Sequence, residues 1–359
     1  MKFIHTADLH LDSKIDGLPA EKSRIRKEEI VNVFERLAEY ASNNSVRAVI
    51  IAGDMFDTSR VTLKTRARVL HAISANKDVD FLYLSGNHDD DNFLSEIDEL
   101  PHNLKVFNDV WTAYRYDNVV ISGITLVGEN SKMAYDTLSL NEKDVNVVVM
   151  HGQVVGYKSK EKTETISIPS LKEKNIDYLA LGHIHSFAEG KIDERGKYAY
   201  CGCLEGRGFD ELGDKGFVLI DTNDDNLRTE FVKFSKRNLY EYEFDVSSFS
   251  DWYVARENLM NNLSNLYSKN SLLKVVLVGE HKADFEIDKN NLVLRLNEEF
   301  FFAKVYDKTE LKINIEEYAH DKSVRGEFVR AVWESDLSLE IKNKVIMCGL
   351  NALKGEDVQ

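Results

Sequence analysis

The strongest constraint in this sequence is a set of five short polar segments, each placed directly after an apolar run typical of a β-strand. The apolar runs are residues 2–6, 46–52, 81–84, 145–150 and 176–181. Residues 22–43 and 61–76 instead repeat their apolar side chains at helical spacing. Because strands alternate with helices, the sequence predicts an α/β fold in which helices cover the faces of a sheet.

The polar segments are rich in histidine, aspartate, asparagine and glycine. They are Asp8-Leu9-His10, Gly53-Asp54-Met55-Phe56-Asp57, Gly86-Asn87-His88-Asp89, His151-Gly152 and Gly182-His183-Ile184-His185. Glycine lets the backbone turn sharply where a strand ends. Because the carboxyl ends of strands in open α/β folds meet at one edge, we expect these side chains to converge there.

The residue types indicate a metal centre. Carboxylates, an amide and imidazoles form an oxygen and nitrogen ligand set without thiolate, which suits Mn²⁺, Fe²⁺ or Zn²⁺ in a reactive site. Two ions of this kind sit about 3.5–4 Å apart, so one carboxylate must bridge them. Any one segment alone is a weak signal, but five in order, each at a strand end, predict a two-metal site.

The rest of the chain has a different pattern. From about residue 198 to residue 234 it is rich in strand-like runs. Residues 239–318 predict a small α+β unit, with a helix over 250–268 and strands that include 272–278, 291–296 and 300–306. The last part, about 322–355, has the apolar spacing of two helices.

Net charge and composition limit the classes of function that we expect for this protein. The formal net charge of −15 argues against a large, uniformly basic surface for nucleic acid, although basic clusters occur at 22–27, 60–68 and 158–162. Such clusters are most often solvated faces.

No apolar run approaches the ~18 residues of a membrane span, and the first residues lack a secretory pattern, so we expect a cytoplasmic protein without membrane partners. The three cysteines are expected to be reduced thiols.

Together the five segments resemble the calcineurin-like metallophosphoesterase superfamily. The opening FIHTADLHLDS, with GDMFD, GNHD, MHG and GHIH, is similar to the SbcD-type DNA repair nucleases within it. The likeness continues through residues 200–207, Glu211 and Lys215, but Cys203 stands where the family often has serine or asparagine. It implies a metallophosphoesterase-type β-sandwich flanked by helices over 1–238, a small α+β capping domain over 239–318, and C-terminal helices over 319–359 that bind a partner or pack on their own domain.

The resemblance also implies roles for individual residues. The first metal ion would be held by Asp8, His10 and His185. The second ion would be held by Asn87, His151 and His183. Asp54 would bridge the two ions, His88 would be the catalytic acid, and Asp57 would orient His88. Manganese is the expected metal, with iron or zinc as alternatives.

The resemblance implies a DNA exonuclease or endonuclease subunit that works with an SbcC-type SMC-like ATPase and forms a homodimer. Two other hypotheses remain open. The acidic net charge is compatible with a phosphodiesterase or phosphatase for a nucleotide or another small phosphoester. A non-catalytic subunit that binds DNA ends or the ATPase is disfavoured, because such a subunit would not need the complete ligand set.

Overall fold

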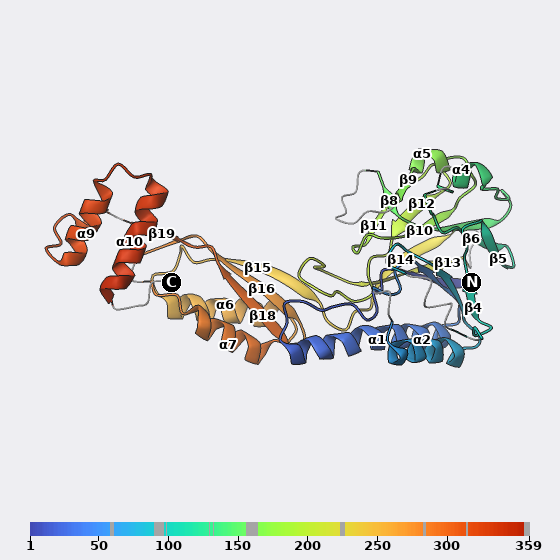
Figure 1. The fold of residues 1–359 in the computed structure, drawn as a ribbon, viewed down its shortest axis with the longest axis horizontal. Coiled ribbons are helices and arrows are strands. Elements are labelled where there is room, and N and C mark those ends of the chain that lie inside the picture. Colours follow the sequence, from blue (N-terminus) through green and yellow to red (C-terminus); the bar gives the residue numbers. More distant parts are fainter. Residues whose placement is uncertain are drawn as a thin grey trace. The chain divides into compact units, whose positions relative to one another are not determined.

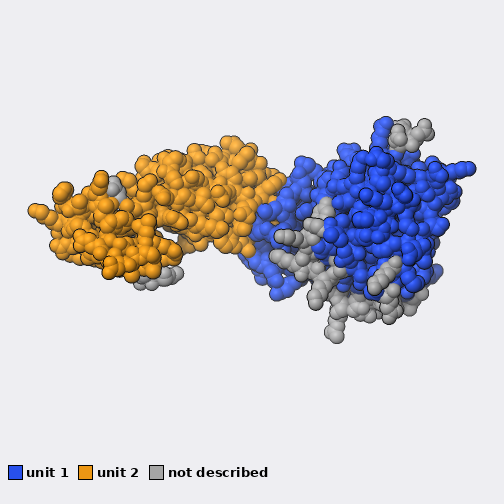
Figure 2. All heavy atoms as spheres, turned by 90° about the horizontal axis from the view of Figure 1, so that it is seen from above, with its two compact units in different colours: residues 1–238 blue, residues 239–359 orange. Residues whose placement is uncertain are grey.

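The computed structural model describes residues 1–57, 61–89, 97, 99–128, 130–131, 133–155, 164–222, 227–282, 285–313 and 315–354. The chain divides into two compact units, Met1–Asn238 and Leu239–Gln359 (Figure 2). Among the described residues, no helix is both long and apolar enough to cross a membrane.

The first unit is built on two six-stranded sheets (Figure 1). The first sheet has the order β14 (Arg228–Lys233), β13 (Gly216–Asp221), β1 (Lys2–Thr6), β2 (Val46–Ala52), β3 (Asp80–Leu84) and β4 (Leu104–Val106). The second sheet has the order β11 (Ala188–Lys191), β12 (Lys197–Tyr200), β10 (Tyr178–Gly182), β7 (Val145–His151), β6 (Val119–Gly123) and β5 (Thr112–Tyr116). Neighbours from β1 to β4 are parallel, as are β12, β10, β7 and β6.

Because side chains alternate between the two faces of each strand, the two sheets produce three apolar layers in this unit. Ile50 of β2 and Val149 of β7 are fully buried in the core between the sheets. The opposite face of the first sheet, with Val49 and Ile51, packs against α1 (Ala20–Asn43) and α2 (Leu63–Ala75). The short helices α4 (Met133–Thr137) and α5 (Ile168–Leu171) lie beside the second sheet (Figure 1). The expected α/β sandwich flanked by helices is therefore confirmed. A two-stranded sheet, β8 (Gln153–Val154) with β9 (Thr165–Ile166), completes the described strands of this unit.

In the second unit, β15 (Leu239–Asp245), β16 (Leu272–Val278) and β18 (Phe302–Asp307) form a parallel sheet. Helices α6 (Trp252–Leu266) and α7 (Lys289–Glu299) pack on one face of it. The strand predicted over residues 291–296 is wrong, because these residues lie in α7, where the Asp288 side chain caps the helix by accepting from the Asn291 N–H. Parallel strands need a crossover between them, and α7 supplies the one from β16 to β18.

The end of the chain has its own small core. The helices are α8 (Ile315–Tyr318), α9 (Val324–Trp333) and α10 (Leu339–Lys354), and β17 (Glu280–His281) pairs with β19 (Glu310–Leu311) nearby. Ile346 and Leu350 of α10 are buried against Val329 of α9. Ile341 and Val345 lie on another face of α10 and remain 46% and 37% exposed. One face of α10 thus packs on its own unit while another stays open.

Candidate metal centre

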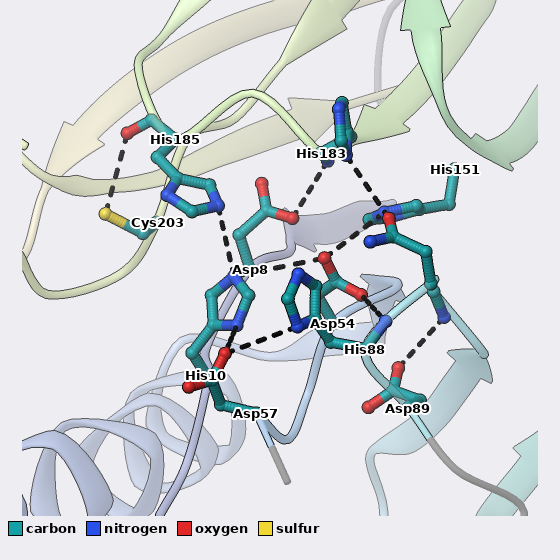
Figure 3. Close-up of polar contacts among 12 residues, drawn as sticks. Asp8, His10, Asp54, Asp57, His88, Asp89, His151, His183, His185 and Cys203 are labelled. Carbon is teal, nitrogen blue, oxygen red and sulfur yellow. Dashed lines mark hydrogen bonds and ion pairs between the residues drawn. The ribbon is translucent and has the colours of Figure 1, made fainter. Parts of the chain in front are cut away.

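The five polar segments meet at the carboxyl ends of parallel strands from both sheets (Figure 3). In the first sheet, Thr6 pairs with Ile51 and Ala52 pairs with Leu84, so β1, β2 and β3 end at the same level. In the second sheet, the ends of β7 and β10 are aligned by the pairing of Gly182 with His151. This register brings side chains from five separate parts of the chain to one place, as the sequence predicts.

The first cluster contains Asp8, His10 and His185, whose ligand atoms all lie within 4.8 Å of one another. The Nε2 atoms of His10 and His185 face each other at 3.1 Å. Two nitrogen ligands at about 2.1 Å from one ion would be about 3.0–3.4 Å apart at octahedral to tetrahedral angles. The two imidazoles therefore have the spacing of ligands that share an ion.

The second cluster contains Asp54, His151 and His183, again within 4.8 Å. The Asn87 Oδ1 atom lies 3.0 Å from His151 Nε2 and 3.3 Å from His183 Nδ1. The other ring nitrogen of His151, Nδ1, donates to the Ala52 carbonyl at 2.9 Å. That bond selects the tautomer whose Nε2 lone pair points into the cluster.

Asp54 lies between the two clusters. Its Oδ2 atom is 3.3 Å from His151 Nε2 and 3.9 Å from His10 Nε2. Its Oδ1 atom accepts a hydrogen bond from the His88 backbone N–H at 2.9 Å. Burial alone would raise the pKa of Asp54, but the His151 and His10 imidazoles hold it well below its ordinary value. Burial alone would lower the pKa of His151, but the Asp54 carboxylate favours the charged imidazole. The pKa of His151 therefore rises to about 9.

Asp57 contacts a second histidine, His10, in addition to the His88 that the sequence predicts. Its Oδ1 atom lies 3.4 Å from His88 Nδ1, the expected partner, but only 3.0 Å from His10 Nδ1. Burial works against the Asp57 carboxylate, yet these imidazoles and Arg207 lower its pKa. One carboxylate can therefore orient both the candidate acid and a candidate metal ligand.

Sequence reasoning assigned no role to Glu211, Arg207 or Asp89. Glu211 accepts from His185 Nδ1 at 2.8 Å and from the Arg207 guanidinium at 2.8 Å. Burial works against this ionised carboxylate, but His185 and Arg207 lower its pKa. The only sequence signal for Glu211 is its place in the stretch that resembles the nucleases; no local spacing connects it with His185.

Asp89 joins two of the strand-end loops. Its carboxylate accepts from the backbone N–H groups of Met55 at 3.2 Å, Phe56 at 2.9 Å and Gly86 at 2.9 Å. Burial, together with the nearby Asp54 carboxylate, raises the pKa of Asp89. The loops that carry Asp54 and Asn87 are thus connected to each other through one half-buried side chain.

The backbone is strained at the candidate ligands. Asp8, His10 and Asp54 have φ angles of 54°, 45° and 53°, and His183 has 103°. Positive φ is unfavourable for residues with a side chain, and strain of this kind concentrates at functional sites. Residue 182 must be glycine for a steric reason, because a Cβ at this position would lie 2.0 Å from the Ala52 carbonyl oxygen.

The clusters fit metal ions by their donor chemistry. Within the part of the chain that the structure describes, the buried Oδ2 atom of Asp8 has no hydrogen-bond partner. A buried carboxylate oxygen without a partner is costly, and a bound cation would satisfy it. With imidazole nitrogens and no thiolate turned inward, the residues suit borderline divalent cations.

Comparisons with known proteins agree with this geometry. Residues 1–187 match the profile of the calcineurin-like phosphoesterases. The DNA double-strand break repair protein Mre11 of Aeropyrum pernix is 26% identical over 343 residues, covering 87% of this chain and 80% of its own. The uncharacterized metallophosphoesterase YhaO of Bacillus subtilis is 24% identical over 294 residues, covering 77% of this chain and 71% of its own. Because the matched profile spans more than half of the chain and contains both clusters, the chain belongs to the calcineurin-like phosphoesterase family.

Proposed function

We propose that this protein is a metal-dependent DNA exonuclease or endonuclease that hydrolyses phosphodiester bonds with two divalent ions, manganese first among them. The observation that carries this proposal is the pair of clusters at the strand ends with the Asp54 carboxylate between them. A phosphoesterase with one ion would have no use for both clusters.

In this proposal, one ion would be held by Asp8, His10 and His185. The other ion would be held by Asn87, His151 and His183, and Asp54 would be a ligand of both. When bound, the ions would supply a hydroxide near neutral pH and offset the charge on the phosphate oxygens.

His88 and Asp57 would handle the proton that leaves with the product. The His88 side chain is 25% exposed, so a substrate can reach it, and Asp57 Oδ1 lies 3.4 Å from its Nδ1. With Nδ1–H directed to the carboxylate, the protonated Nε2 can donate to the departing oxygen. The His88 backbone N–H, held by Asp54 Oδ1, keeps this ring beside the clusters.

DNA is favoured as the substrate by the relatives. The matched protein of Aeropyrum pernix is a DNA double-strand break repair protein, and the likeness runs through most of both chains. We further propose that residues 239–318 are a capping domain that admits DNA, and that the protein acts as a homodimer in the cytoplasm.

The C-terminal segment, residues 319–359, would bind an SMC-like ATPase of the SbcC type. The open face of α10, with Ile341 and Val345, supports this assignment, because an exposed apolar stripe on a helix fits a partner helix.

The test is an assay of the purified protein with Mn²⁺ on linear duplex, hairpin and single-stranded DNA, and on a small chromogenic phosphodiester. His88→Ala should lower DNA cleavage about 10²–10⁴-fold, because it removes the general acid. Both ions should still bind to this variant. Turnover of the small phosphodiester with intact DNA would refute the DNA assignment, and turnover of neither substrate would refute phosphodiester hydrolysis.

A further inference from the structure

The two histidines of the first cluster are backed by carboxylates. His10 Nδ1 lies 3.0 Å from Asp57 Oδ1, and His185 Nδ1 lies 2.8 Å from Glu211 Oε1. Each imidazole therefore keeps its proton on Nδ1 and presents the Nε2 lone pair to the cluster. A carboxylate behind an imidazole also makes the ring a stronger donor to a metal ion.

The second cluster has a weaker arrangement. The Nδ1–H of His151 meets the neutral carbonyl of Ala52 at 2.9 Å. Besides the shared Asp54, its oxygen ligand is the neutral amide of Asn87, whereas the first cluster has the Asp8 carboxylate. Apart from the shared Asp54, the negative charge of the centre is concentrated around the first cluster.

Arg207 connects the two backing carboxylates. Its Nη1 atom lies 3.4 Å from Asp57 Oδ1, while Nε and Nη2 donate to Glu211 Oε1 at 3.0 and 2.8 Å. The Arg207 backbone N–H also donates to Glu211 Oε2 at 2.7 Å. Because the Glu211 side chain is only 4% exposed, these bonds are little screened by water.

This arrangement differs from a surface ion pair. Glu211 is held by His185, by the Arg207 side chain and by the Arg207 backbone, so its carboxylate has little freedom to turn away. A ligand whose partner is fixed in this way loses little entropy when the ion binds.

We propose that the Asp57–Arg207–Glu211 chain makes the two metal positions unequal. The position of Asp8, His10 and His185 binds its ion more tightly than the position of Asn87, His151 and His183. Glu211 is the positioning residue that sets the difference through His185. The inference rests on the proposed two-metal site, but it concerns binding and does not depend on the substrate.

The experiment is a calorimetric titration of the full chain with Mn²⁺, with free Mn²⁺ followed by its electron paramagnetic resonance signal. The wild type should bind two ions in a tight and a weak step. Asn87→Ala should remove the weak step and leave the tight one, which assigns the steps to the clusters. Loss of the tight step in Asn87→Ala would overturn the proposal.

Glu211→Gln keeps the shape of the side chain but removes its charge. The tight step should weaken about tenfold to a hundredfold, while the weak step changes little. The unchanged weak step shows that the variant is folded. Equal weakening of both steps, or of neither, would overturn the proposal.

Glu205→Gln is the matched control. Glu205 is a buried glutamate of the same loop, but it pairs with Arg26 at 2.7 Å instead of a histidine. Both binding steps should keep their wild-type affinities in this variant; a weaker tight step would overturn the proposal. Absent DNA cleavage beside two unequal binding steps would refute the proposed function and leave this inference standing.

Discussion

Asp89→Asn should loosen the metal centre without touching a candidate ligand. In the wild type, Asp89 Oδ2 accepts from the N–H groups of Met55 and Gly86, and Oδ1 accepts from Phe56. Asparagine has one acceptor oxygen and one NH₂ group. Whichever way the amide turns, at least one backbone N–H must face another donor.

The size of the effect follows from these contacts. A hydrogen bond to a charged group contributes about 1.5–3 kcal/mol, and a buried donor without a partner costs about 1–3 kcal/mol. The less damaging orientation keeps the oxygen toward Met55 and Gly86 and loses only the bond from Phe56. We therefore expect the free energy of unfolding to fall by about 1–3 kcal/mol, because both figures describe the one lost contact and do not add.

The consequence for the site is a weaker second cluster. Asp89 connects the loop of Asp54 with the loop of Asn87, so the spacing between these two candidate ligands should become less defined. Urea unfolding at pH 8 measures the loss of stability, and Mn²⁺ calorimetry on the same samples measures the loss of affinity. We expect the affinity of the second ion to fall about tenfold or more, as when the partner of a ligand is removed.

A second aspartate offers a matched control. Asp193 also accepts three backbone N–H bonds, from Glu173, Arg195 and Gly196 at 2.8, 2.9 and 3.0 Å, but it contacts no candidate ligand in the described structure. Asp193→Asn should cost stability and leave metal binding unchanged. If Asp89→Asn changed the free energy of unfolding by less than ~0.5 kcal/mol, which is usual for a surface change, the reasoning would be refuted.

Three further predictions concern pH, packing and bridging. Burial lowers the pKa of His5 from 6.5 to about 3, so the folded state excludes a proton that the unfolded state binds. The stability from neutral His5 is complete above pH 6.5 and should fall by about 1.4 kcal/mol for each unit as pH drops toward 3. Urea unfolding at several pH values should show that the free energy of unfolding falls less steeply with decreasing pH in His5→Gln than in the wild type. An equal slope in the two proteins would contradict this prediction. Gly182→Ala would place a Cβ 2.7 Å from His151 Nδ1, so calorimetry should show the second ion bound about tenfold more weakly. Gly128→Ala is its control, because among the described residues its Cβ would meet only Glu164 Oε1, at 3.8 Å; equal affinities in the two variants would count against the packing argument. Asp54→Ala should abolish activity and the binding of both ions, and two ions still bound at full occupancy would exclude the bridging role.

Much of the centre follows from local sequence. An apolar β-branched run that ends in glycine and a polar residue is a short-range pattern, so the five strand ends can be located without tertiary information. The expected strands at 2–6 and 46–52 are the β1 and β2 of the structure. The donor types alone already indicate borderline divalent cations, because ligand preference is a property of the residue and not of the fold.

Some helices and strands could not be predicted from the local sequence. Residues 291–296 have apolar side chains that suit a short strand, but the parallel sheet of the second unit requires a crossover there and makes them helical. Strands β5 and β6 were not expected, although they form one edge of the second sheet. Short apolar runs are ambiguous, and tertiary context decides between their alternatives.

The sequence by itself determined the order, the chemical types and the strand-end positions of the polar segments. Only the tertiary structure decided which side chains face each other: His10 meets His185 across 175 residues, Asp57 reaches His10 as well as His88, and Glu211 stands behind His185. The physical reason is the separation along the sequence between the residues that interact. Residue type and strand periodicity are local, whereas these contacts arise from the order and register of strands in two packed sheets, which no single segment encodes.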